Sequence, residues 1–257
     1  MWNRRLFTAL TSFALYLAAP LPVLAQEPIR ILATGVFAST LPSLAGPFEA
    51  ASGYKLQVSI ANAGQVAARV AAGEPADLVM SSSASIKTLA KQGVLVPEEV
   101  AIGKMRLGVA GPAGAQTPDM ASADTFRGLL LSARKVAYID PNGGGTSGPF
   151  FEKMFVSLGI SDAVHGKAIL GKDGREIVEA VASGAATIGM TQASEIIGAT
   201  GVKFAGYLPD SLNLTTPYAA SITTQSKNAK AATAFLAFIA SPVGSDHLRR
   251  AGWAIDR

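Results

Sequence analysis

The stretch "ARVAAGEPADLVMSSS", residues 68–83, contains the repeating unit on which the fold depends. It begins inside an amphipathic stretch that starts at about Gln65 and continues into the apolar run "ADLVMSS", which is typical of a buried strand. Serines then lead into the helical pattern "ASIKTLAKQG", whose Gly93 stands where a helix C-cap is expected. The unit is therefore a helix, a strand, a hydroxyl-rich turn and a second helix.

The same alternation recurs along most of the chain. Apolar runs typical of strands are followed by stretches with helical spacing, such as residues 39–52 and 228–240. The further strand-like runs are residues 29–34, 55–61, 104–112, 135–140, 167–171 and 186–191. Strands that alternate with helices predict an α/β fold built on a parallel sheet.

The first residues predict a signal peptide. Arg4 and Arg5 precede an apolar stretch at residues 6–25, which closes on the small-residue cleavage pattern Val-Leu-Ala. Prolines within the stretch and the cleavage pattern argue against a membrane anchor. We expect cleavage after Ala25 and a mature chain that works in the periplasm.

Composition narrows the possible partners. The chain carries 22 Lys and Arg against 18 Asp and Glu, and its net charge of +4 falls to +2 once the two arginines of the leader are removed. This weak balance, without a basic cluster, argues against nucleic acid or a membrane surface as partner. With 0 Cys, disulfides and thiol chemistry are excluded. We expect a monomer that is not inserted in a membrane after cleavage.

The turns from strand to helix share one chemistry. Each carries small or hydroxyl residues at or before a helix start, where free backbone N–H groups and the helix dipole can hold an oxyanion. In an open α/β sheet these turns lie at the carboxyl ends of the strands, where ligands bind. The turns are residues 33–39, 61–65, 80–85, 141–149, 171–176 and 190–194. One such turn would be an ordinary helix cap, whereas six predict an anion cradle.

The turn "PNGGGTSGP", residues 141–149, also fits a nucleotide motif. Gly143, Gly145 and Gly148 satisfy the spacing G-x-G-x-x-G between a strand and a helix. However, residues 140–142 insert a turn before the first glycine, and no Gly-Lys-Ser/Thr of a P-loop is present. We therefore favour an anion site without a cofactor.

Metal and nucleophile chemistry have little support. The two histidines, His165 and His247, do not lie in a ligand-spaced cluster, so no metal site is predicted. Asp140 and Glu152 flank the glycine-rich turn, but turn-forming and surface roles explain them more simply than a catalytic pair.

Two arginines are candidates for ligand contact. Arg106 lies in an apolar strand, where its charge needs an anionic ligand or an acidic side chain as partner. Arg175 lies at a presumed helix start, where the dipole disfavours a cation unless an anion is near. A structural ion pair is the alternative for each.

Four blocks of sequence resemble the type II periplasmic substrate-binding proteins, in the branch around the molybdate-binding proteins of ABC importers. These blocks are residues 31–95, 138–160, 177–191 and 231–253, and "ARVAAGEPADLVMSSS" is the most specific element. The resemblance implies two α/β lobes with mixed, mainly parallel sheets, joined by two crossover strands, with the ligand between the lobes. The expected segments are lobe 1 at 26–107, lobe 2 at 108–216 and a return to lobe 1 at 217–257. Hinges are expected near Arg106 and Tyr218.

The chain departs from the molybdate pattern that this resemblance implies. The positions of two serines and a closing tyrosine fall at about Val36, within residues 62–64 and at about Gln192, none of which carries a hydroxyl. The roomier glycine-rich loop favours a larger anion, and we expect an organic di- or tricarboxylate captured for an ABC permease. Two alternatives stay open: an enzyme similar to aconitate isomerase, which belongs to this branch and moves a double bond, and a molybdate or tungstate binder. No catalytic base is identified from the sequence.

The candidate ligand contacts combine the turns with the two arginines. They are Thr34, Gly35, Val36, Asn62, Ala63, Arg106, Gly145, Thr146, Ser147, Gly174, Arg175, Thr191 and Gln192.

Overall fold

A computed structural model describes residues 27–256, so the predicted signal peptide lies outside the described residues. Within them, nine strands form one hydrogen-bonded sheet in the order β2-β1-β3-β9-β4-β7-β5-β6, with β8 paired to β4. The strands are β1 (Ile29–Thr34), β2 (Leu56–Ala61), β3 (Leu78–Ser82), β4 (Val100–Pro112), β5 (Val136–Ile139), β6 (Ala168–Gly171), β7 (Ile188–Gln192), β8 (Val202–Tyr207) and β9 (Thr215–Ile222).

The first group of strands surrounds β1. Strand β1 pairs in parallel with β2 and β3, and β3 pairs antiparallel with β9. Its core is rich in aromatic side chains, with Phe37 stacked on Trp253 and Phe48 against Phe235. The helices of this group are η1 (Gly35–Phe37), α1 (Thr40–Ser52), α2 (Ala63–Ala71), α3 (Ser83–Lys91), α9 (Ala229–Ala240) and α10 (Pro242–Arg250).

The second group surrounds β5. Strand β5 pairs in parallel with β6 and β7, and β7 and β8 pair antiparallel with β4. A separate core forms where Tyr138 meets Phe151 and Phe155 edge to face. Its helices are α4 (Ala123–Ser132), α5 (Ser147–Ser157), α6 (Ser161–His165), α7 (Gly174–Ala182), α8 (Ala193–Ile196) and η2 (Asp210–Leu212).

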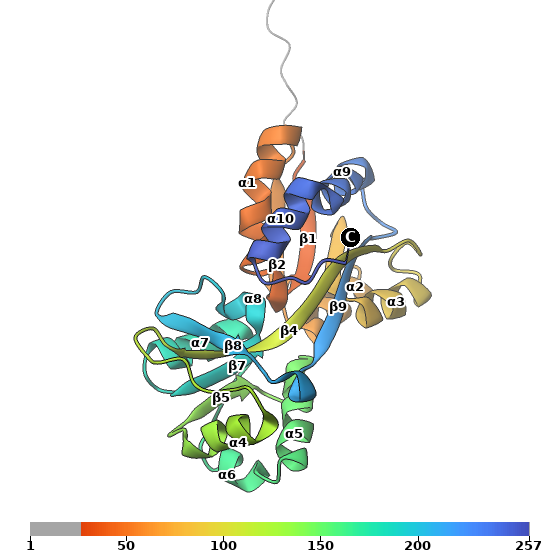
Figure 1. The fold of residues 1–257 in the computed structure, drawn as a ribbon. Helices are drawn as coiled ribbons and strands as arrows, with labels where there is room; N and C mark the ends of the chain where they lie inside the picture. The colour runs from red at the N-terminus through yellow and green to blue at the C-terminus, as the bar shows by residue number, and fades with distance from the viewer. Residues whose placement is uncertain (1–26, 257) are drawn as a thin grey trace, which may run out of the picture.

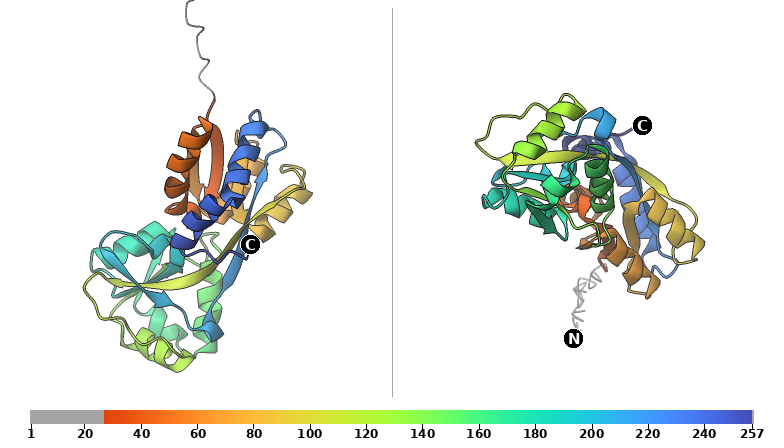
Figure 2. Two further views of the ribbon diagram at one scale, coloured as in Figure 1. Left: turned by 45° about the horizontal axis from the view of Figure 1, so that its top comes forward. Right: turned by 90° about the horizontal axis from the view of Figure 1, so that it is seen from below.

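Strand β4 belongs to both groups. Its first residues pair with β9, ending at Arg106 opposite Thr215, and from Leu107 onward it pairs with β7 and β8. Figure 1 shows β4 and β9 running side by side from one group of helices to the other, and the left view of Figure 2 shows the same two groups one above the other. The arrangement confirms the predicted two-lobed α/β fold. The residue boundaries of the lobes stay a prediction.

The strands that the sequence indicates are present with small shifts in their ends. The predicted run 104–112 begins four residues earlier in the structure, at Val100, and Gly93 adopts the left-handed conformation (φ 75°) expected just past a helix end. Strand β8 and helix α10 were not predicted, and β9 was expected only from the resemblance, as a crossover near Tyr218. Among the described helices, none has the length and apolar character required to cross a membrane.

Candidate ligand-binding site

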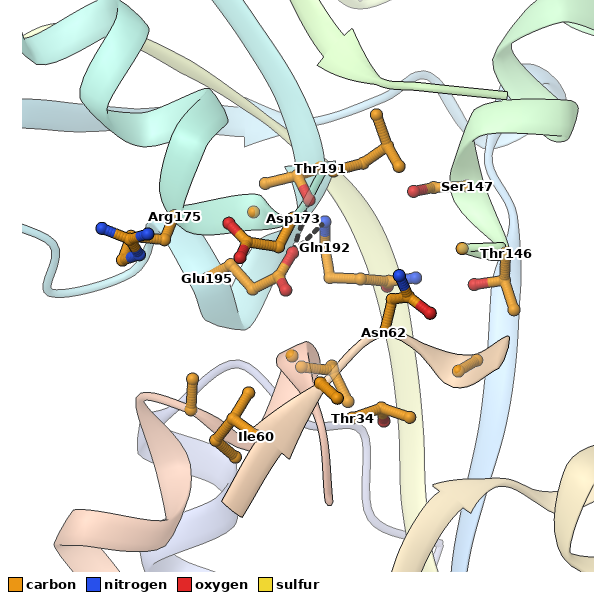
Figure 3. A pocket seen from close by; sticks show the side chains of 18 of the residues that line it. Thr34, Ile60, Asn62, Thr146, Ser147, Asp173, Arg175, Thr191, Gln192 and Glu195 are labelled. Atoms are coloured by element: carbon orange, nitrogen blue, oxygen red, sulfur yellow. Dashed lines mark hydrogen bonds between the residues drawn. The ribbon is translucent and has the colours of Figure 1, made fainter. Parts of the chain in front are cut away.

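A cavity of about 800 Å³ lies between the two strand groups (Figure 3). We call its two sides the first wall, formed by lining residues between 34 and 82 together with Tyr218, and the second wall, formed by lining residues between 139 and 199. Each wall consists of turns that follow parallel strands. The carboxyl ends of strands from both groups therefore meet at this one cavity, as expected for an α/β ligand site.

The first wall presents polar atoms from two turns. Strand β1 ends at Thr34, whose Oγ1 is buried and has no hydrogen-bond partner. Strand β2 leads to Asn62, whose Oδ1 accepts a hydrogen bond from the Gln65 N–H (2.9 Å) and so caps α2. A buried polar atom without a partner costs about 1–3 kcal/mol, so a partner for the Thr34 hydroxyl in the cleft would lower the free energy.

The second wall includes the glycine-rich turn. Thr146 precedes α5 without a side-chain hydrogen bond that caps the helix, so the N–H groups of its first turn lack a side-chain partner. The following Gly148 is required by the fold, because a Cβ there would lie 2.7 Å from the Ile139 carbonyl oxygen and 2.8 Å from that of Asp140. Part of the glycine content thus serves the close approach of α5 to the end of β5, and the rest leaves backbone exposed at the cavity.

Helix α7 brings charges to the second wall. Asp173 accepts a hydrogen bond from the Glu176 N–H (3.0 Å) and caps the helix. Arg175 donates to Glu179 on the next turn (2.9 Å), which supplies the structural ion pair considered from the sequence. Lys172 also lines the cavity. The N-terminus of α7 is therefore capped by the carboxylate of Asp173. The positive charges of the second wall come from Lys172 and Arg175.

Glu195, in α8, also lines the second wall. Its Oε2 accepts hydrogen bonds from the Thr191 hydroxyl and from the Gln192 N–H (3.3 Å). Burial raises the pKa of Glu195 to about 7, with the nearby Asp173 charge adding to the rise and the two hydrogen bonds opposing it. The carboxyl group thus changes its charge near neutral pH.

Gln192 precedes Glu195 at the end of β7. Its side chain is 5% exposed, and both its Oε1 and its Nε2 are buried without a partner. In Figure 3 it lies between Glu195 and Asn62, across the cavity from Thr34. The Gln192 amide therefore places one hydrogen-bond donor and one acceptor without partners at the cleft.

Tyr218, in β9, closes the first wall from behind. Its ring meets Phe37 and Trp253 edge to face, at centroid distances of 5.7 and 5.4 Å. Burial raises the pKa of the Tyr218 hydroxyl, with the Glu195 charge as a second cause, so the phenol stays neutral.

Hydrogen bonds join the two walls directly. Asn62 Nδ2 donates to the Gly143 carbonyl (2.8 Å), and the Gly64 N–H donates to the Gly144 carbonyl (3.1 Å). On the other side of the cavity the Ser194 hydroxyl donates to the Val36 carbonyl (2.8 Å). The cleft is thus bridged at two places, as in a closed form.

Comparison with known proteins agrees with this architecture. Residues 29–254 match the family described as bacterial extracellular solute-binding proteins. The chain belongs to this family. It is 30% identical to an aconitate isomerase from Pseudomonas sp. over 248 residues, which cover 92% of this chain and 93% of the relative. It is 25% identical to the molybdate-binding protein ModA of Rhodobacter capsulatus, covering 96% and 95%.

The solved structures show the same fold. The periplasmic molybdate-binding protein of Azotobacter vinelandii superposes with a TM-score of 0.76 at 22% identity, over 89% of this chain and 100% of that one. This solute-binding protein therefore shares its fold with oxyanion binders, and its own ligand has to be argued from the residues of the cleft.

The structure brings together nearly all the candidate contacts of this solute-binding protein. Along the first wall lie Thr34, Gly35, Val36, Asn62 and Ala63, and along the second lie Gly145, Thr146, Ser147, Gly174, Arg175, Thr191 and Gln192. Lining the cavity is a matter of position, and contact with a ligand stays a prediction for each residue.

Arg106 is the candidate that lies elsewhere. Its guanidinium forms an ion pair with Asp210 and sits 4.6 Å from the centre of the Tyr207 ring. The acidic side chain that the sequence left open as a partner is thus present, and we do not include Arg106 in the cleft.

The weaker candidates also have structural partners. His165 Nε2 lies 2.8 Å from Glu152 Oε2, and Tyr138 donates to the other oxygen of the same carboxylate (2.8 Å). Asp140 accepts from the Asn142 N–H in a turn. In the part of the chain that the structure describes, no group of three metal-binding side chains is found.

Sequence reasoning missed Glu195, Lys172, Asp173 and Tyr218 as lining residues. Lys172 and Asp173 lie in the indicated turn 171–176, so attention to their charges could have found them. Glu195 follows the turn 190–194 by one residue, but no pattern in the sequence signals its burial.

Proposed function

We propose that this protein captures a small organic anion with two or more carboxylates in its cleft. The observation that carries the proposal is the set of buried, unpartnered polar atoms, Thr34 Oγ1 on the first wall and the Gln192 amide on the second. Their positions beside the uncapped start of α5 favour a ligand that offers several oxygen atoms at once. The hydroxyls of Thr146 and Ser147 extend the same surface.

The size of the cavity supports an organic ligand. About 800 Å³ lies within the range of 300–1,000 Å³ typical of small-molecule pockets, whereas a single tetrahedral oxyanion fills only a small part of such a volume. Apolar side chains line the cavity too, including Ile60, Ile139 and Val178. A carbon skeleton bearing carboxylates fits both the volume and this mixed lining better than molybdate does.

The proposal extends to transport. We propose that the mature protein is a periplasmic monomer that hands its ligand to an ABC permease, with lobes at 26–107 and 108–216 and a return at 217–257. The adjacent crossovers near Arg106 and Tyr218 would act as the hinge, since β4 and β9 pair there as the chain passes between the strand groups.

A second candidate function is isomerisation of the bound carboxylate. Two observations favour it: the 30% identity with an aconitate isomerase along nearly the whole chain, and a cleft carboxyl group, Glu195, that changes its charge near neutral pH. An allylic shift removes a proton from one carbon and returns it to another, so no atom is gained or lost. A carboxylate with a pKa of about 7 is suited to both steps.

The experiment compares trans-aconitate with molybdate on purified protein. A ligand at about a hundred times its Kd stabilises the fold by about 3 kcal/mol, so a carboxylate ligand should raise the Tm by about 5–10 °C. Ultraviolet absorbance and product analysis of the same mixture detect conversion to the cis isomer.

Each outcome selects one function. Stabilisation by trans-aconitate without conversion supports the binding protein, and conversion supports the isomerase. Stabilisation by molybdate but by no di- or tricarboxylate would contradict the proposed ligand class. Joint replacement of Thr146 and Ser147 by Ala should weaken carboxylate binding without unfolding the protein, and unchanged affinity would remove both residues from the site.

A further inference from the structure

The charges that line the cleft do not favour an anion when all are ionised. Lys172 and Arg175 are balanced by Asp173 and Glu195, so the net charge of the lining is zero. Asp173 is fixed in its role as the cap of α7. Glu195 is therefore the lining group whose protonation would remove a negative charge from the site.

The hydrogen bonds of Glu195 are one-sided. Both bonds, from the Thr191 hydroxyl and the Gln192 N–H, end on Oε2. No donor among the described residues is hydrogen-bonded to Oε1. In a carboxylic acid one oxygen accepts hydrogen bonds and the other carries the proton. The surroundings of Glu195 therefore suit Oε2 as the acceptor and Oε1 as the protonated oxygen.

Two glycines make room for this carboxyl group. A Cβ at Gly174 would overlap the Glu195 carboxyl carbon and both oxygens, and a Cβ at Gly35 would lie 2.7 Å from Oε1. Gly35 belongs to the first wall and Gly174 to the second, so the free oxygen lies at the junction of the walls. In Figure 3 the carboxyl group of Glu195 lies next to Thr191, Gln192 and Asp173.

We propose that anion binding in the cleft is coupled to the uptake of one proton by Glu195. Solvent supplies the proton, which forms an O–H bond at Oε1, and the resulting carboxylic acid donates a hydrogen bond to a carboxylate oxygen of the ligand. The bond between the proton and the hydronium ion or buffer acid that gives it up breaks in the same step, and no bond to carbon changes. The inference rests on the proposed function for the class of ligand, a carboxylate. The protonation of Glu195 itself would accompany the binding of any anion beside it.

The neighbouring charges agree with this coupling. From α7 and the turn before it, Asp173 disfavours an ionised Glu195, while Lys172 and Arg175 line the same cavity. From β9, Tyr218 is neutral, and η1 carries no charged residue. Arg106 in β4 is held by Asp210, and β8 carries Lys203, whose ammonium group donates to the Ala115 carbonyl (3.4 Å). A ligand anion beside Glu195 raises the pKa of the Glu195 carboxyl group further. Because of this linkage, anion binding is accompanied by proton uptake.

The test is calorimetric titration with trans-aconitate and, separately, with molybdate, between pH 6 and 9. Repeating each titration in buffers of different ionisation enthalpy counts the protons taken up. For wild type we expect an uptake that approaches one proton near pH 8 and an affinity that falls by up to tenfold per pH unit above about 7. Glu195→Gln should bind with little pH dependence and no uptake.

A matched control replaces an acid outside the cleft. Glu98 is exposed and does not line the cavity, so Glu98→Gln should keep the wild-type pH profile and proton count. If Glu195→Gln does not fold, the carboxyl ¹³C resonance of Glu195 in the wild-type protein can be titrated instead. Comparison with Glu195→Asp identifies this resonance. We expect its midpoint to rise when either anion is bound.

Three outcomes would overturn the inference. The first is a wild-type affinity that does not depend on pH and comes without proton uptake. The second is a Glu195→Gln variant whose affinity depends on pH as in wild type. The third is an affinity that increases with pH, which would show that the ligand binds when Glu195 is ionised. Binding of molybdate but of no carboxylate would instead contradict the proposed ligand class, and proton uptake with molybdate would still support the role of Glu195.

Discussion

The two walls of the cleft are built from the same kind of turn but carry different chemistry. Every charged side chain that lines the cavity belongs to the second wall, namely Lys172, Asp173, Arg175 and Glu195. The first wall offers only neutral groups, such as the Thr34 hydroxyl, the Asn62 amide and the Tyr218 phenol. The charge of the site is therefore set by one side of the cleft, while the other supplies shape and hydrogen bonds.

This division has a physical consequence for closure. When the cleft is open, the charged side chains of the second wall are solvated, and the neutral first wall loses little solvation free energy as it covers them. Lys172 and Arg175 stay exposed, and Arg175 is paired with Glu179, so the neutral first wall can approach the second without burying their charges. The following changes test this division in order of expected effect on free energy.

Gly148→Ala should have the largest effect, because it breaks the second wall itself. The new Cβ would lie 2.7–2.8 Å from backbone atoms of residues 139–141, which cannot move aside like a flexible side chain. We expect a loss of about 3 kcal/mol in the free energy of unfolding, measured in urea.

Gly128→Ala is the matched control for that substitution. Gly128 lies in α4, is exposed and has no atom within 4 Å of a new Cβ, so the change should stabilise the protein by about 0.5–1 kcal/mol. Equal effects of the two substitutions would show that the close approach of α5 to the end of β5 does not matter.

Glu195→Gln should alter how stability depends on pH. The pKa of Glu195 is raised from 4.5 to about 7 in the folded protein, so between these values the native state holds a proton that the unfolded chain has lost. The free energy of unfolding of the wild type therefore falls as pH rises from about 4.5 to about 7, by about 3 kcal/mol at most. The Gln variant should lack this decrease.

The measurement is a series of urea unfolding curves of both proteins from pH 4.5 to 8. Other groups titrate equally in both proteins, so the difference between the two curves isolates Glu195. A constant difference across this range would mean that the carboxyl group is not shifted in the fold and that the second wall is permanently charged.

Thr34→Val tests the hydrogen-bonding role of the first wall. Valine has nearly the shape of threonine and removes the buried hydroxyl that lacks a partner, so the ligand-free protein should keep or gain stability. Carboxylate affinity should fall about tenfold, which corresponds to about 1.4 kcal/mol. Calorimetry and thermal unfolding measure the two effects, and a parallel loss of both would assign Thr34 to the fold rather than to the ligand.

The sequence predicted the strands that have short apolar, β-rich runs, such as β1 and β3. It did not reveal β9, because "TTPYAASI" mixes a proline with small residues and resembles neither an apolar run nor an alternating strand. The role of β9 depends on its partners β3 and β4, which are more than a hundred residues away along the chain. Non-local pairing of this kind leaves no local pattern.

The turns of the cleft could be predicted because the physics of a helix start is local. Thr34, Asn62 and Ser147 line the cavity as a direct result of following strands of one sheet. Arg106 could not be placed, since its partner Asp210 is 104 residues away. Glu195 could not be found either, because its burial requires Gly35 and Gly174, which belong to opposite walls.

Asn62→Asp should have the smallest effect and tests the neutrality of the first wall most directly. Aspartate keeps an oxygen that can cap α2 through the Gln65 N–H, but it loses the donor to the Gly143 carbonyl and adds a negative charge. We expect stability within about 0.5 kcal/mol of wild type and carboxylate affinity lower by about fivefold, or about 1 kcal/mol. Asn62→Ala removes both the cap and the bridge, so it should also lose about 1 kcal/mol of stability. Wild-type affinity in Asn62→Asp, measured by calorimetry at pH 7, would show that a charge is tolerated on the first wall, and the contrast between the walls would then not determine which ligand binds.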